Sequence, residues 1–167
     1  MKKAPTTLAG QHGVMLLEAL IAILIFSIGI LAIVGMQAVA IQNVGEAKNR
    51  TDASFLANEI LGDMWTDRAN IPSFAYSGSG SAPPALQNWV AKVVNDMPGA
   101  ATYGPKVEIT ATPFATASGS STHTAYDVKV TVRWQSPRDA SLGTLPHTYT
   151  TMAYIQYCTP QNGLYLC

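Results

Sequence analysis

The chain has 167 residues, and its ten lysines and arginines balance ten aspartates and glutamates, so its formal net charge is zero. This balance argues against a nucleic-acid partner, because proteins that bind nucleic acids usually carry a basic excess or a basic patch. Charged residues make up only 12% of the chain, about half the ~25% typical of soluble domains. The length fits one domain. Most of the shortfall in charged residues comes from one segment near the N-terminus.

That segment contains no charged residue from Ala19 to Gly45. As a helix it spans about 40 Å, which exceeds the roughly 30 Å hydrocarbon core of a bilayer. The pattern predicts a membrane anchor and excludes a plain cytosolic enzyme. Lys2 and Lys3 precede the segment, whereas the first charges after it cancel one another. Positive residues stay in the cytoplasm, so we expect a cytoplasmic N-terminus and an exported remainder.

A removable secretory signal is the first alternative, with Ala38-Val39-Ala40 as the cleavage site and Ile41 as the new N-terminus. The apolar run is about twice the usual 7–15 residues of such a signal. Apolar residues also precede this segment from Val14 on, so Glu18 lies one turn inside a longer apolar stretch, where a carboxylate costs a few kcal/mol. Either Glu18 marks the membrane edge and reaches into the headgroups, or it meets a cation from another chain or a new N-terminus.

The run Gly13-Val14-Met15-Leu16-Leu17-Glu18, behind a short basic leader and before the apolar segment, resembles the class III signal of type IV prepilins. The resemblance implies that a prepilin peptidase cuts between Gly13 and Val14 and methylates the Val14 amine. Glu18 then becomes the fifth residue of the mature chain and pairs with a neighbour's Val14 amine in a filament. Such a pair would fix the axial register, because a lone buried charge is costly.

Two positions depart from the family pattern. Val14 stands where the family most often has Phe, and Gly35 stands where main pilins often have Pro. Gly29 and Gly35 each weaken a helix by about 1 kcal/mol relative to Ala. They indicate either local melting in a filament or close packing against another helix, and both interpretations stay open.

The predicted organisation is a leader at 1–13, a transmembrane and assembly helix at 14–41, and a periplasmic head at 42–167. The helix is expected to run from Val14 to about Thr66, roughly 80 Å at 1.5 Å per residue. Its last part is amphipathic, with one apolar face made by Ala53, Leu56, Ala57, Ile60 and Met64 and with Leu61 beside it.

Residues 67–104 are predicted to hold a loop and a short helix. The stretch 70–84 is rich in Gly, Ser and Pro, which is typical of a loop, and we interpret it as a flexible tether. Apolar residues at helical spacing predict a helix over 85–96, stopped by Met97-Pro98-Gly99. Trp89 on that helix is expected in the core rather than stacked on a ligand.

Alternating apolar and polar residues predict strands at 106–111, 126–135 and 149–157 within the region 105–167. One buried and one wet face indicate an antiparallel sheet, with turns at 113–124 and 136–146. The fold class is therefore α+β, with one long N-terminal helix packed on a small antiparallel sheet. The resemblance implies the same arrangement, the pilin fold.

The two cysteines, Cys158 and Cys167, lie at the end of the chain. An even number in an exported domain predicts a disulfide, which would stabilise the fold by about 3 kcal/mol on the chain-entropy estimate. Two free thiols are the alternative.

No enzyme, cofactor or metal is expected. Nucleotide-binding and serine-hydrolase motifs are absent, and His12, His123 and His147 lack the spacing of metal ligands. Asp127 and Asp139 are interpreted as solvated surface residues rather than calcium ligands. Three classes of protein compete: a filament subunit, a membrane-anchored enzyme and a secreted domain cut after Ala40.

Residues 57–70, the helix 86–89 leading to Met97-Pro98-Gly99, and the strand ending at Trp134 resemble the PilV family of minor pilins. The resemblance implies a protein that primes pilus assembly with other minor pilins and the major pilin through its N-terminal helix. It also implies a single-pass inner-membrane location with a periplasmic head, then a place at the pilus tip and cell surface with an adhesin as a further partner. A minor pseudopilin of a type II secretion system is the alternative.

Overall fold

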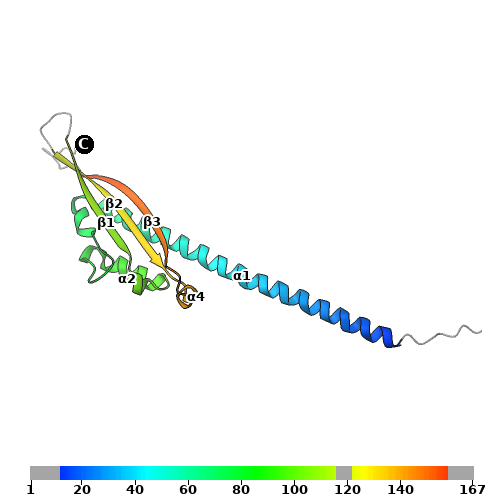
Figure 1. Ribbon diagram of the computed structural model, residues 1–167. Helices are drawn as coiled ribbons and strands as arrows, with labels where there is room; N and C mark the ends of the chain where they lie inside the picture. Colours follow the sequence, from blue (N-terminus) through cyan, green and yellow to red (C-terminus); the bar gives the residue numbers. More distant parts are fainter. Residues whose placement is uncertain (1–11, 116–121, 158–167) are drawn as a thin grey trace, which may run out of the picture. The chain divides into compact units, whose positions relative to one another are not determined.

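The computed structural model describes residues 12–115 and 122–157. Its elements are one long helix, four short helical segments before the sheet, three strands, and a short helix between the last two strands (Figure 1). The chain divides into two compact units, one ending at Glu46 and the other beginning at Ala47. Each is described here by itself.

Helix α1 runs without interruption over His12–Thr66, so the expected long helix is confirmed. It contains no proline, and Ser27 donates its hydroxyl to the Ile23 carbonyl at 2.7 Å within the same helix. The helix ends because Asp67 leaves helical geometry, with φ −116° and ψ 57°. The Thr66 hydroxyl and the Asp67 N–H both bond to the Asp63 carbonyl, at 2.8 and 3.0 Å, and so satisfy part of the helix end.

Within the second unit, the last part of α1 provides one side of the head's core. The expected apolar face is confirmed, and the neighbouring Leu61 is buried with it. These side chains meet the inner face of the sheet and the short helices in one cluster. The buried residues of α1 are Ala53, Leu56, Ala57, Ile60, Leu61 and Met64.

The prediction of a flexible tether over 70–84 is wrong. Arg68–Phe74 forms a 3-10 helix, η1, and buries Ile71 and Phe74. Tyr76 then pairs with Val107, with N–H to carbonyl distances of 2.9 and 2.8 Å in the two directions. Burying an apolar side chain of this size contributes about 1.5–3 kcal/mol. That gain offsets the conformational entropy that a segment rich in Gly, Ser and Pro loses when it becomes ordered.

The predicted short helix is confirmed as α2, Gln87–Asp96, entered through the 3-10 turn η2, Pro84–Leu86. A further turn of helix, α3 at Ala100–Tyr103, follows it. Gly99 precedes α3 with φ +72°, and a Cβ there would lie 3.0 Å from the Gln135 carbonyl oxygen. Glycine is therefore needed at this position both for its backbone and for space.

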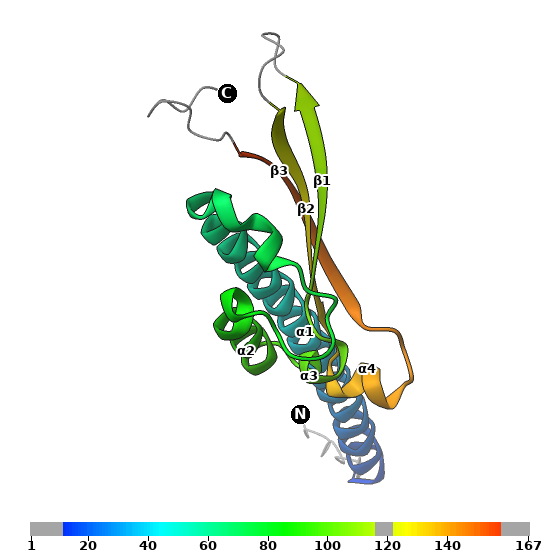
Figure 2. The same ribbon diagram turned by 90° about the vertical axis from the view of Figure 1, so that its left-hand side faces the viewer.

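The sheet has the order β1-β2-β3. Both strand pairs are antiparallel, so the predicted antiparallel sheet is confirmed. Its strands are β1 at Lys106–Ala115, β2 at Thr122–Trp134 and β3 at His147–Tyr157. β1 and β2 thus extend into the stretch 113–124 that was predicted to be a turn. Figure 2 shows α2 beside the head part of α1, on one side of the sheet. The buried side chains facing them are Val107, Val128, Val130, Val132, Trp134 and Ile155.

The stretch 136–146 is more ordered than the predicted turn. It contains the short helix α4, Pro137–Ser141. Gln135, just before it, is buried and donates its side-chain amide to the Thr144 carbonyl at 2.6 Å. That bond satisfies a buried polar group and ties the end of the stretch to the end of β2.

Candidate functional site

The Gly13–Val14 bond lies in the first turn of α1, which begins at His12. The first four N–H groups of a helix have no partner within it, so this bond lies at a helix end with incomplete backbone bonding. Val14 is 69% exposed. Removing residues up to Gly13 would take away only two residues of α1 and leave the rest of the helix intact.

Glu18 lies one turn after Val14 and is exposed. Within 12–115 and 122–157, no side chain or backbone group bonds to its carboxylate or forms an ion pair with it. Helical side chains lean toward the N-terminus of the helix, so this carboxylate leans toward Val14. The position suits a carboxylate that receives a cation located near the start of α1.

The helix around Glu18 is apolar on all sides. From Val14 to Val44 its large apolar side chains are exposed, and a helix that is apolar all round belongs in a protein core or a membrane. In the part of the chain that the structure describes, α1 is the one helix long and apolar enough to cross a membrane. A single-pass membrane anchor is therefore compatible with its length and composition.

Small residues make up half of one shallow face on this part of α1. It borders a hollow of about 520 Å³ lined by Ala32, Gly35, Met36, Val39, Ala40 and Asn43. A Cβ built at Gly29 or Gly35 meets no atom within 4 Å. Contacts among the described residues therefore do not require glycine at these two positions, and local melting and packing against another chain both remain explanations for them.

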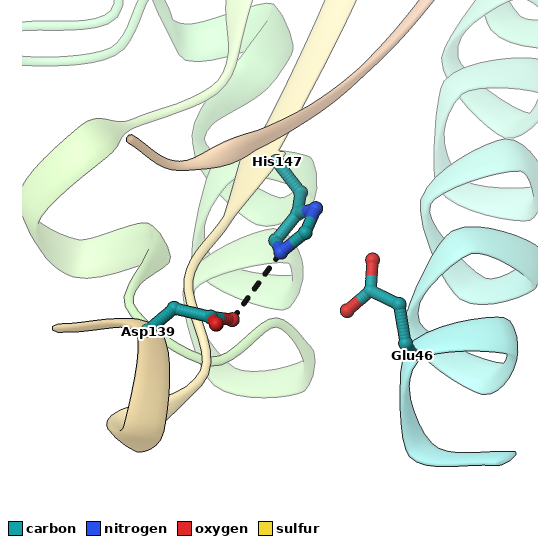
Figure 3. Close-up of side chains that lie close together, drawn as sticks. All are labelled: Glu46, Asp139 and His147. Atoms are coloured by element: carbon teal, nitrogen blue, oxygen red, sulfur yellow. Dashed lines mark hydrogen bonds and ion pairs between the residues drawn. The ribbon is translucent and has the colours of Figure 1, made fainter. Parts of the chain in front are cut away.

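A second polar cluster lies in the head, around Asp139 (Figure 3). The Ser136 hydroxyl donates to Asp139 Oδ2 at 2.6 Å, and His147 Nε2 lies 3.2 Å from the same oxygen. The His147 ring also stacks on Trp134, with centroids 5.6 Å apart and planes 16° apart. The Ser136 hydroxyl, and after it His147, hold the pKa of the Asp139 carboxyl below its usual value.

These contacts correct the interpretation of Asp139 as a solvated surface residue, because it is half-buried and hydrogen-bonded. Asp127 is exposed, as expected, and accepts a hydrogen bond from the Thr112 hydroxyl at 3.1 Å. A signal for α4 was present in the sequence. Ser136 followed by Pro137 and, three residues on, by Asp139 is similar to a capping box with proline at the first helical position.

Charged pairs elsewhere in the head are structural. Lys92 on α2 bonds to both oxygens of Glu59 on α1, at 2.9 and 2.7 Å. On the outer face of the sheet, Lys106 and Lys129 lie 2.7 and 3.4 Å from the Glu108 carboxylate, and they lower the pKa of that carboxyl. These groups are partly exposed, so each pair contributes little to stability.

The predicted disulfide partners Cys158 and Cys167 lie outside the described residues, as do Lys2 and Lys3. The chain matches no family model, no curated protein and no solved structure. The fold and the site define an α+β protein with one long apolar N-terminal helix, able to span a membrane, and a three-stranded antiparallel sheet.

Proposed function

We propose that the chain is a minor pilin of the PilV type, which primes assembly of a type IV pilus with other minor pilins and the major pilin. Glu18 carries this proposal. It is an exposed carboxylate on an otherwise apolar helix surface, one turn from the Gly13–Val14 bond and without a partner among residues 12–115 and 122–157.

The energetic cost of an unpaired carboxylate explains how Glu18 directs assembly. A carboxylate surrounded by apolar material costs a few kcal/mol, and an opposite charge within reach removes much of that cost. Cleavage by a prepilin peptidase creates such a charge at Val14, on the same helix end and on every copy. Pairing Glu18 with a neighbour's methylated Val14 amine selects one axial register among apolar helices that otherwise slide freely.

The head has a structural part in this proposal. Four residues of the PilV-like segment 57–70 lie in the core: Ala57, Ile60, Leu61 and Met64. Trp65 in the same segment is 43% exposed, and the Arg68 guanidinium lies 5.1 Å from the centre of its ring. The segment therefore packs the end of α1 into the head and leaves one aromatic side chain exposed, which suits contact with another pilus subunit.

Glu18→Gln tests the proposal, since it removes the charge and keeps the shape. Asp52→Asn is the matched control, because it removes the same charge from an exposed i,i+4 pair with Lys48 on the same helix. We expect both variants to be cleaved normally, and only Glu18→Gln to disappear from sheared pili.

Equal incorporation of the two variants would contradict the role of Glu18. Deletion of the chain should also lower the number of pili and leave protein secretion unchanged. Loss of secretion with normal pili would instead assign the chain to the alternative, a minor pseudopilin.

A further inference from the structure

The loop between α4 and β3 exposes two leucines. Leu145 is 87% exposed, more than any other large apolar side chain among residues 12–115 and 122–157, and Leu142 is 64% exposed. Residues 142–147 contain no Asp, Glu, Lys or Arg. Single exposed apolar residues are common on protein surfaces, whereas neighbouring ones mark contacts with proteins or membranes.

The backbone of this loop is largely satisfied by its own hydrogen bonds. The N–H groups of residues 142–144 each donate to a carbonyl of α4, at 3.0, 3.2 and 3.1 Å. The Thr144 carbonyl accepts from the buried Gln135 side chain at 2.6 Å, and Pro146 has no N–H group to satisfy. Most of the polar backbone groups at the tip therefore do not depend on water, which suits a poorly hydrated environment.

The loop lies at the end of the head at which α1 enters it. Near the start of β3, Tyr149 accepts a hydrogen bond from the Ser54 hydroxyl at 3.2 Å. β3 also lies against η1, which follows the end of α1. β3 therefore runs in the same direction as residues 47–66 of α1, and Figure 2 shows α4 at the end of the sheet where β3 begins.

Chain lengths bring the loop close to the apolar part of α1. Ser54 lies nine residues after Gly45, where the charge-free segment ends, and nine residues of helix span about 14 Å. Leu145 precedes Tyr149 by four residues, which span up to about 13 Å in extended chain. The exposed leucines can therefore reach the level at which α1 leaves a bilayer.

We propose that Leu142 and Leu145 insert into the interface of the bilayer that α1 spans. Two leucines bind a membrane weakly by themselves, but α1 keeps the loop at the surface, so the contact forms within one molecule at a high effective concentration. This second contact restricts tilting of the head relative to the membrane. The inference rests on α1 as a membrane anchor, which is also part of the proposed function.

The test uses the full-length chain, purified and reconstituted in vesicles of phosphatidylethanolamine and phosphatidylglycerol, with a coumarin amino acid in place of Leu145. The matched control carries the probe in place of Met152, which is 72% exposed and lies further along β3. A probe in place of Val34, in the apolar part of α1, reports the anchor. With lipids that carry nitroxide quenchers on their acyl chains, we expect quenching at Leu145 and Val34 and little at Met152.

The outcomes separate the loop contact from the anchor. Quenching at Leu145 no stronger than at Met152, with Val34 quenched, would overturn the loop contact and leave the anchor intact. The vesicles contain no other protein, so the same result is expected if the leucines bind a protein instead of lipid. An unquenched probe at Val34 would contradict the anchor, and with it both this inference and the proposed function.

Replacing both leucines tests the contact by substitution. Leu142→Ser combined with Leu145→Ser should lower the quenching of a probe in place of Ser141 at least about threefold, whereas Met152→Ser should leave it unchanged. The double variant should keep the parent's unfolding midpoint in urea, because exposed side chains contribute little to stability. Equal quenching of the double variant and the parent would overturn the proposal, and so would a lowered midpoint, which would assign the leucines to the fold.

Discussion

Trp89 joins α2 to α1 through its ring and its indole N–H. It is 5% exposed and donates to the Leu56 carbonyl at 2.8 Å. Trp89→Phe removes the bond and part of the packing, so we expect a loss of at least about 1 kcal/mol in the free energy of unfolding. Urea unfolding of the detergent-solubilised protein measures it. Trp65→Phe at a 43% exposed position is the control and should stay within about 0.5 kcal/mol of the parent.

Because of Asp139, we expect the stability of the head to change with pH in the acidic range. Hydrogen bonds from Ser136 and His147 place its folded pKa below the ordinary value of 3.8. A carboxyl with a lowered pKa contributes stability above its unfolded pKa, and that contribution is lost as the pH falls through the folded value. Asp139→Asn should therefore lower the unfolding temperature near neutral pH, and the difference should shrink below about pH 4.

Thermal unfolding followed by circular dichroism across this pH range checks the effect. Asp127→Asn, at an exposed position, is the control and should show a smaller difference. If the difference in unfolding temperature between Asp139→Asn and the parent stays constant down to the lowest pH, this account of Asp139 is wrong.

At the scale of elements, α4 depends on its cap. Ser136 accepts from the Asp139 N–H at 3.2 Å at the start of a helix that buries none of its own side chains. Ser136→Ala should cost about 1 kcal/mol and speed amide exchange over 138–141. Ser141→Ala removes only an exposed bond to the Arg138 carbonyl and is the control. Equal exchange in both variants would show that the cap does not hold α4.

The elements that could be predicted from sequence are those with a long, regular pattern. α1, α2 and the alternating strands each repeat one apolar spacing over many residues, and tertiary packing then reinforces it. η1 could not be predicted because Ile71 and Phe74 lie among residues typical of loops, and only their burial orders the segment. β1 and β2 also extend beyond the residues in which apolar and polar side chains clearly alternate, so these strand ends could not be predicted.

The candidate site divides in the same way. Gly13, Val14 and Glu18 are close in sequence, so their spacing alone brings them together. Asp139 and His147 meet only because α4 returns the chain beside the start of β3. No spacing rule predicts that contact, although Ser136 and Pro137 are residues typical of a helix start and so could have indicated α4.

At the scale of the whole molecule, the topology in the membrane is a prediction from charge. Lys2 and Lys3 should keep the N-terminus in the cytoplasm, so alkaline phosphatase fused after the last residue should be active outside it. Changing both lysines to Glu should lower that activity by reducing correct insertion. If the fused phosphatase is active only when the fusion point precedes the apolar segment, the orientation is the reverse of the predicted one.

Mass spectrometry of the N-terminal peptide, taken from the protein in its native membrane, shows where the chain is cut. The proposed role of Glu18 depends on that cut, because cleavage creates the Val14 amine. The proposed function predicts a chain that begins at Val14 with an added methyl group on its amine. A chain that begins at Ile41 would have lost Glu18 with a secretory signal, and an uncut chain that begins at Met1 would be a simple membrane-anchored protein. Either of these two results would contradict the proposed function.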